Sequence, residues 1–230
     1  MKFRSRLAAL LAVLAIASPL PNAAADNWQA DITRFSTRDV TVTSQGCKNV
    51  PVTMAVWEDP AVWYTDITTH IYRGYEEVDY TWFSPNEPDL WQWCHFMGGF
   101  GRFRLGPSDV TTDTDNGSYT DEDFTYGWVK VKAGSRSSLT SAVRTGRTVK
   151  LTAKVTAYVY DRAAFRPWAQ ANVVFQHRLA GSAVWRSLPP VTTNSDGVAT
   201  RSVSMTRRYW RAVASEALLR FGSTSGQLLR

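Results

Sequence analysis

A two-residue alternation of apolar and polar side chains is the feature of this chain that most constrains its fold. From Val149 to Val159 every second residue is apolar, and the residues between are Lys, Thr or Tyr. A period of two places the apolar side chains on one face of a β-strand, whereas an α-helix needs a period near 3.6. Shorter alternations recur at 40–42, 52–56, 67–71, 129–131 and 171–175. The chain is therefore predicted to be built from strands.

Turn residues divide the alternating segments into strands of ordinary length. Clusters such as Asp115-Asn116-Gly117 and Ser195-Asp196-Gly197 fall between them and are typical of β-turns. Apart from a short stretch at 216–221, no segment after residue 25 has the periodicity of an amphipathic helix. Many short strands with one polar face are typical of β-sandwiches of about 100 residues. We therefore expect an all-β protein with two sandwich domains in tandem, at 26–133 and 134–230.

The first 25 residues have the layout of a secretory signal peptide. Lys2, Arg4 and Arg6 precede an apolar run at 7–20, and small alanines at 23–25 follow it, as a cleavage site requires. The apolar run is shorter than the roughly 20 residues that cross a bilayer. We therefore expect a cleaved signal peptide at 1–25, no membrane span, and a secreted, extracellular protein. An uncleaved anchor is the alternative.

The charges are sorted by position along the chain. Residues 26–128 hold 17 Asp and Glu against 6 Lys and Arg, a net charge of −11, and residues 129–230 hold 17 Lys and Arg against 3 acids, a net charge of +14. Charge segregation of this size favours two units with different electrostatic roles. Two interpretations remain open: the halves attract each other, or the basic half meets an external anionic partner.

The two cysteines, Cys47 and Cys94, are predicted to form one structural disulfide. An even count in an exported protein favours a disulfide over free thiols. The sequence has no C-x-x-C motif, which argues against a redox role, and no His lies near Cys47 to complete a zinc site.

The second half resembles the immunoglobulin-like modules common in secreted proteins of high-GC Gram-positive bacteria. The matching pieces are Gly146-Arg147-Thr148-Val149-Lys150-Leu151, Val173-Val174-Phe175-Gln176-His177-Arg178, Trp185, Asp196-Gly197 and Tyr209-Trp210-Arg211. This resemblance implies a sandwich with Trp185 in the core between its sheets and a hairpin turn at Asp196-Gly197. Such modules serve as spacers, adhesive units or appendages that contact carbohydrate or protein, so the resemblance implies no particular activity.

The first half is only loosely similar to an immunoglobulin domain. Its order Cys47, Trp57, Cys94 resembles the disulfide between the two sheets and the core Trp of that fold. The spacing is short, and Gln92 stands two residues before the second cysteine, where that family has Tyr. Together the two resemblances imply two immunoglobulin-like β-sandwich domains in tandem.

Tryptophan is concentrated in the first half, and we expect an aromatic patch there at Trp63, Trp82, Trp91 and Trp93. Because Trp91 and Trp93 are two residues apart, their rings share one face of a strand. If Cys94 points into the core, that face points outward, where rings suit sugars or a protein partner. The alternative is that this face is the buried one.

Two charged clusters are further candidates. Asp113, Asp115, Asp121 and Asp123 surround the turn at Asn116-Gly117 and could bind Ca²⁺, which prefers oxygen ligands. Their spacing does not fit an EF-hand, so an exposed acidic hairpin is the favoured alternative, and no other cofactor is expected.

The basic candidate is Arg207, Arg208 and Arg211, interleaved with Tyr209 and Trp210. Arginines interleaved with aromatic rings can hold anionic groups. Export argues against nucleic acid as the partner of this patch. An anionic polymer of the cell envelope is a better candidate, and the acidic first half of the chain is the most plausible partner.

Catalytic motifs are missing from the sequence. Gly222-Ser223-Thr224-Ser225-Gly226 has Thr at the centre, where a nucleophile elbow requires Ser, and neither H-E-x-x-H nor a phosphate-binding glycine loop occurs. We therefore expect a non-enzymatic, secreted binding protein that contacts an envelope polymer, a carbohydrate or another extracellular protein. The alternative is a small secreted hydrolase or hydrolase inhibitor on the same scaffold.

Overall fold

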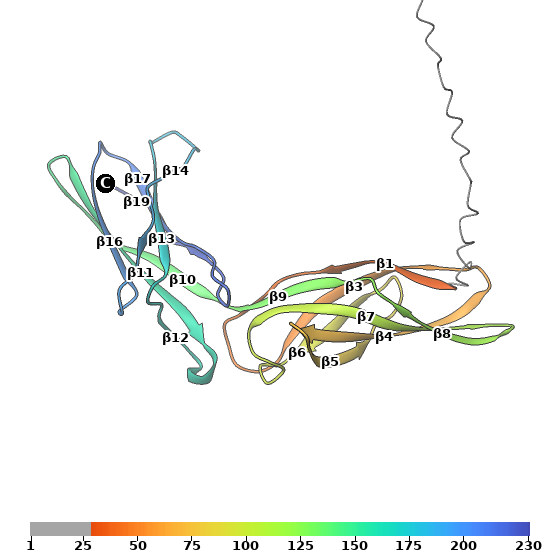
Figure 1. Ribbon diagram of the computed structural model, residues 1–230. Coiled ribbons are helices and arrows are strands. Elements are labelled where there is room, and N and C mark those ends of the chain that lie inside the picture. Colours follow the sequence, from red (N-terminus) through yellow and green to blue (C-terminus); the bar gives the residue numbers. More distant parts are fainter. Residues whose placement is uncertain (1–28) are drawn as a thin grey trace, which may run out of the picture.

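The computed structural model describes residues 29–230, so the expected signal peptide lies outside the described residues. Within that range the chain forms nineteen strands and one short 3₁₀-helix, η1 (Tyr160–Arg162), which confirms the all-β fold. The stretch at 216–221 is not helical but contains turns and isolated β-bridges. No helix among the described residues is long and apolar enough to cross a membrane. Two β-sandwiches follow each other along the chain, with their long axes at a steep angle (Figure 1).

The N-terminal sandwich packs a three-stranded sheet against a six-stranded one. The small sheet has the order β1 (Ala30–Thr37), β3 (Lys48–Glu58), β6 (Pro88–Trp93). The large sheet has the order β2 (Val40–Val42), β9 (Gly127–Ala133), β7 (Gly101–Thr114), β4 (Val62–Arg73), β5 (Glu76–Trp82), with β8 (Gly117–Asp123) paired to β7. Alternate residues such as Met54 on β3 and Ile67 on β4 fill one buried core between the sheets.

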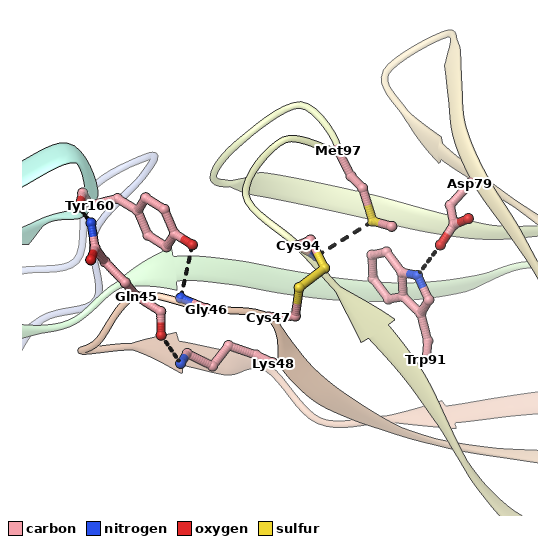
Figure 2. Close-up of a disulfide and its surroundings, with 9 residues drawn as sticks. All are labelled: Gln45, Gly46, Cys47, Lys48, Asp79, Trp91, Cys94, Met97 and Tyr160. Atoms are coloured by element: carbon pink, nitrogen blue, oxygen red, sulfur yellow. Dashed lines mark hydrogen bonds between the residues drawn. A yellow bond between two sulfur atoms is a disulfide. The ribbon is translucent and has the colours of Figure 1, made fainter. Parts of the chain in front are cut away.

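Trp91 and Trp93 belong to this core and not to the surface, so their expected place in an exposed patch is wrong. Their side chains are 1% and 0% exposed. Trp91 stacks edge-on against Phe103, with 5.4 Å between ring centroids, and its indole N–H donates to Asp79 Oδ2 at 2.8 Å (Figure 2). Cys94 lies just beyond the end of β6. Its direction therefore says nothing about the face on which Trp91 and Trp93 lie.

The disulfide between Cys47 and Cys94 is confirmed, but it does not connect the two sheets. Cys47 (Figure 2) directly precedes β3, and Cys94 directly follows β6. These strands are neighbours in the small sheet, with Lys48 opposite Trp93. Trp57, expected in the core by the same resemblance, is half exposed. The bond therefore fastens two strand ends within one sheet.

The C-terminal sandwich has a four-stranded and a six-stranded sheet. The first has the order β10 (Ser135–Thr145), β11 (Thr148–Val159), β12 (Ala164–Pro167), with β16 (Val198–Ser204) paired to β11. The second has the order β14 (Arg186–Ser187), β13 (Asn172–Arg178), β17 (Tyr209–Ala214), β18 (Ser223–Thr224), with β15 (Val191–Thr192) on β13 and β19 (Leu228–Leu229) on β17. The alternation at 149–159 correctly predicts β11, whose Leu151 and Val155 are fully buried.

Trp185 does not occupy the core of this sandwich, contrary to what the resemblance implies. The buried indoles are those of Trp168 and Trp210. Trp185 lies partly exposed in the segment before β14, where the guanidinium of Arg211 stands 4.1 Å from its ring centroid. The turn at Asp196-Gly197 does form, and Gly197 has φ of +72°.

The two sandwiches meet where β9 passes through Gly134 into β10. Tyr160 of η1 stacks on His95, with 4.0 Å between ring centroids and 4° between ring planes. Its hydroxyl accepts a hydrogen bond from the backbone N–H of Gly46 at 3.0 Å, and its carbonyl accepts one from Gln45 Nε2 at 3.2 Å. Figure 2 shows Tyr160 beside the disulfide.

A buried lysine adds an ion pair at the same junction. Lys132 of β9 donates to Glu216 Oε1 at 2.5 Å and to the carbonyl of Ala217 at 3.0 Å, and Lys130 lies 3.6 Å from the same carboxylate. The hydrogen bond from Lys132 holds the pKa of Glu216 below its ordinary value. All three residues belong to the basic half of the sequence. Within residues 29–230, the ion pairs between the sandwiches therefore do not join the acidic half to the basic half.

Candidate functional site

An exposed row of aromatic rings covers the outer face of the six-stranded sheet in the N-terminal sandwich. Strand alternation turns Ile67, Thr69 and Ile71 of β4 inward and leaves Thr68, His70 and Tyr72 outward. Trp82 and Tyr80 on β5 are 60% and 55% exposed and pack edge to face, 5.7 Å apart. We call the set the aromatic face: Tyr72, Tyr80, Trp82, Tyr126 and Trp128.

The strand register brings these rings together across four strands. Tyr72 of β4 is opposite Arg104 of β7, which is opposite Trp128 of β9. On β5, Tyr80 and Trp82 are opposite His70 and Thr68, which lie two and four residues before Tyr72 on β4. The rings therefore follow a diagonal that crosses three strand spacings, about 14 Å, and extends about 13 Å along β4 from Tyr72 to Trp82. The rings thus form one surface although they come from three separate strands and the segment before β9.

Two arginines hold the rings of the aromatic face in place. The guanidinium of Arg104 lies 4.5 Å from the centroid of Tyr72 and 4.9 Å from that of Tyr126. That of Arg102 lies 3.8 Å from the ring of Trp128. Such cation–π contacts orient a ring without burying it, so the aromatic surface remains accessible and ordered.

His70 fastens the three strands beside Tyr80 and Trp82. Its Nδ1 lies 2.9 Å from Glu77 Oε1 on β5, and its Nε2 lies 3.2 Å from Asp109 Oδ2 on β7. The hydrogen bond to Glu77 is the main cause that raises the pKa of His70 above its ordinary value. Both carboxylates are therefore engaged by one imidazole on the face of a sheet.

The aromatic face contains only one of the four expected tryptophans. Besides the two buried ones, Trp63 is exposed but lies at the start of β4, next to Tyr64. It is five residues from Thr68, the partner of Trp82, which corresponds to about 16 Å along a strand. Trp63 therefore lies out of contact with Trp82, near the opposite end of β4 from Tyr72.

The other residues of the aromatic face were missed by sequence analysis, although a signal for them exists. Tyr80 and Trp82 are two residues apart, as are Tyr126 and Trp128. The same reasoning that was applied to Trp91 and Trp93 would have placed each of these pairs on one face.

The expected calcium ligands do not converge. Asp113 on β7 is opposite Ser118, whereas Asp121 on β8 is opposite Val110 and Asp123 is opposite Ser108. Three and five residues along β7 correspond to separations of about 10 and 16 Å. Among the described residues no group of three His, Cys, Asp or Glu is placed to hold a metal ion. Asp115 is exposed in the turn.

Asp123 has a different role, since it is buried inside the N-terminal sandwich. Its carboxylate accepts hydrogen bonds from the backbone N–H groups of Ile32 and Thr125, at 2.7 and 2.6 Å. It therefore joins β1 to the segment that follows β8.

The basic residues of the C-terminal sandwich surround two neighbouring hollows. The first has a volume of about 420 Å³ and includes Arg178, Trp185 and Arg211 in its lining. The second has a volume of about 270 Å³ and includes Arg178, Arg186 and Arg208. Of the expected basic patch, Arg208 and Arg211 therefore line hollows, whereas Arg207 is exposed and lines neither. Arg178 and Arg186 were missed, because sequence distance separates them from Arg208.

No family model and no curated protein matches this chain. Among solved structures, a tetra-tandem repeat from the extending region of a large adhesion protein aligns over 87% of this chain and 49% of its own, with 12% identity and a TM-score of 0.33. This chain thus spans about half the length of that structure.

Two further structures align with similarly low sequence identity and TM-score. The fibronectin(III)-like modules of Clostridium thermocellum CbhA align over 85% of this chain and 93% of theirs, with 11% identity and a TM-score of 0.32. The D00-D0 domain of intimin aligns over 87% and 98%, with 14% identity and a TM-score of 0.27. Likenesses this distant carry no argument about function, which rests on the geometry of the surfaces above.

Proposed function

We propose that this protein is a secreted, non-catalytic binding protein whose aromatic face holds a carbohydrate chain. The observation that carries the proposal is the diagonal of rings on the outer face of this sheet, of which Tyr80, Trp82, Tyr126 and Trp128 are exposed and Tyr72 is partly exposed. The C–H groups of sugar rings stack on the flat faces of aromatic side chains, and a row about 14 Å wide offers more than one such contact. Fixed polar groups between the rings suit the hydroxyl groups of a sugar.

Binding is better supported than hydrolysis. A glycoside hydrolase needs two carboxyl groups on opposite sides of the bond that it cleaves. Two carboxylates near Tyr80, those of Glu77 and Asp109, both contact His70 instead. A protein partner is the competing occupant of this face. The carboxylates of Glu77 and Asp109 between the rings favour a sugar, because Asp and Glu are depleted at the centre of protein interfaces.

Co-sedimentation with insoluble glycans tests the proposal. The protein is mixed with chitin, cellulose or peptidoglycan stripped of anionic polymers, in about 0.5 M salt to screen charge contacts. We expect it to pellet with at least one of these glycans, and Trp82→Ala and Tyr80→Ala to reduce the bound fraction at least tenfold. Tyr75→Ala is the matched control, because Tyr75 is fully exposed and lies outside the aromatic face.

Two results would contradict the proposal. Either no glycan retains the protein, or Trp82→Ala sediments like the unaltered protein. Equal losses in Trp82→Ala and Tyr75→Ala would show general stickiness of exposed rings and no defined site.

A further inference from the structure

The two hollows of the C-terminal sandwich concentrate positive charge without a counter-charge. Together they are lined by four arginines: Arg178, Arg186, Arg208 and Arg211. Among residues 29–230, no Asp or Glu lines either hollow. The acids of the basic half lie elsewhere: Asp161 is in η1, Asp196 is in the turn before β16, and Glu216 is paired with Lys132. Four guanidinium groups around adjoining hollows create a positive potential that favours an anionic ligand.

Neutral groups hold the arginines in position. Arg211 donates from Nε to Gln176 Oε1 at 2.8 Å. Arg178 donates to the carbonyl of Ser182 at 2.7 Å and to Gln227 Oε1 at 3.1 Å. These acceptors fix the direction of the guanidinium groups but leave their charges unneutralised, so the hollows are organised before any ligand arrives.

The second hollow has an unsatisfied donor in its wall. The Nε atom of Arg208 is buried and has no hydrogen-bond partner, and a buried donor without a partner is costly. Its Nη1 lies 3.4 Å from Nδ1 of His177. Burial is the main cause that lowers the pKa of His177, and the charges of Arg208 and Arg186 lower it further. The lowered pKa favours the neutral imidazole, so the positive charge of the second hollow comes from its arginines.

We propose that the two hollows bind successive phosphate groups of an anionic polymer, with the Arg178 guanidinium between them. Arg178 lines both hollows, so two phosphates can share it as one chain passes from the first hollow to the second. The planar guanidinium fork matches the oxygens of a phosphate. This site is separate from the aromatic face and does not depend on the function proposed for it.

Phosphate is favoured over the carboxylate of an acidic sugar. A sugar ring gains from stacking on an indole, and Trp185 is the indole in these hollows. Its ring is less exposed than those of Trp82 and Trp128 on the aromatic face, and two guanidinium groups contact it, those of Arg211 at 4.1 Å and Arg178 at 5.3 Å from its centroid. The hollows thus offer charge and hydrogen-bond donors more than an aromatic platform.

Calorimetric titration with tripolyphosphate, and with inorganic phosphate for comparison, tests the assignment. We expect tripolyphosphate to bind at least tenfold more tightly than phosphate, with a dissociation constant that increases with salt. Arg178→Gln should weaken tripolyphosphate binding more than tenfold. Arg186→Gln should weaken it at least threefold, and because Arg186 is exposed, this variant cannot fail merely by unfolding.

Arg166→Gln is the control, since it removes the same charge from an exposed position on β12 of the opposite sheet. Its binding should remain within twofold of the unaltered protein. The proposal fails if Arg166→Gln and Arg178→Gln lose affinity equally, or if Arg186→Gln and Arg178→Gln bind normally. Equal affinity for an oligogalacturonate of matched charge would overturn the assignment to phosphate. Sedimentation with neutral glycans in 0.5 M salt should be unchanged in Arg178→Gln, which distinguishes this site from the aromatic face.

Discussion

Tyr160 should determine how firmly the two sandwiches are joined, and the structure gives the size of the effect. Its ring stacks face to face on His95, 4.0 Å away, and stacked rings contribute about 1 kcal/mol beyond their buried area. Its hydroxyl accepts a hydrogen bond from Gly46 at 3.0 Å, and such a bond contributes about 1 kcal/mol net. We therefore expect Tyr160→Phe to cost about 1 kcal/mol and Tyr160→Ala about 2 kcal/mol.

Urea unfolding followed by tryptophan fluorescence measures this cost. Whichever sandwich unfolds first loses the junction, so its free energy of unfolding includes the contact. A double-mutant cycle of Tyr160→Ala with His95→Ala should give a coupling of about 1 kcal/mol, since residues in contact couple by 0.5–3 kcal/mol. Tyr75→Ala, at a fully exposed position, is the control. A coupling below about 0.3 kcal/mol, the usual error of additivity, would refute the role of the stack.

The disulfide provides a second arm of the same experiment. Gly46 and His95 are the chain neighbours of Cys47 and Cys94, so the covalent bond holds both contacts of Tyr160 in place. Figure 2 shows the contact with Gly46. With both cysteines replaced by Ser, Tyr160→Ala should lower the free energy of unfolding by less than it does in the protein with the disulfide. The reason is that the segments that contact Tyr160 are no longer fixed. An equal loss with and without the disulfide would show that the disulfide does not position them.

Two further outcomes are expected in the N-terminal sandwich. The pKa of His70 is raised above 6.5, so its ion pairs stabilise the fold fully below about pH 6.5 and lose that effect as pH rises through the folded-state pKa. NMR titration should show this, with Glu77→Gln lowering the pKa, and a value at or below 6.5 would contradict it. Asp123→Ala leaves the buried N–H of Ile32 unpaired and should lower the free energy of unfolding by about 2–4 kcal/mol. Asp121→Ala, at an exposed position, should change the free energy of unfolding by less than about 0.5 kcal/mol. If urea melts showed the same loss for Asp121→Ala and Asp123→Ala, the structural role of the buried Asp123 carboxylate would be contradicted.

The sequence predicts those features that depend on local pattern. The alternation at 149–159 is long enough to define β11 and its buried face without knowledge of its neighbours. The error at Trp91 and Trp93 has a specific cause. An outward face for Trp91 and Trp93 requires β6 to extend through Cys94, whereas the strand ends at Trp93. Because the side-chain period of a strand is two, a wrong anchor residue assigns the whole strand to the opposite face.

The aromatic face depends on the strand order β9-β7-β4-β5, which differs from the order along the chain. His70 meets Asp109 across 39 residues of sequence, and Arg178 lies beside Tyr209 because β13 pairs with β17. Such contacts come from pairing between distant strands, which no local pattern specifies.

Direct ion pairing between the two halves does not explain the segregation of charge. Of the ion pairs among residues 29–230, none joins an acid of 26–128 to a base of 129–230. The arginines around the two hollows are held instead by neutral acceptors such as Gln176 and Gln227. Their charge is therefore not neutralised by a carboxylate of the described residues, and Tyr160 joins the basic sandwich to the one that carries the aromatic face. A single polymer that carries both sugar rings and phosphate groups could contact both surfaces. Its affinity would then exceed that of either surface alone, because the second contact forms at a high effective concentration.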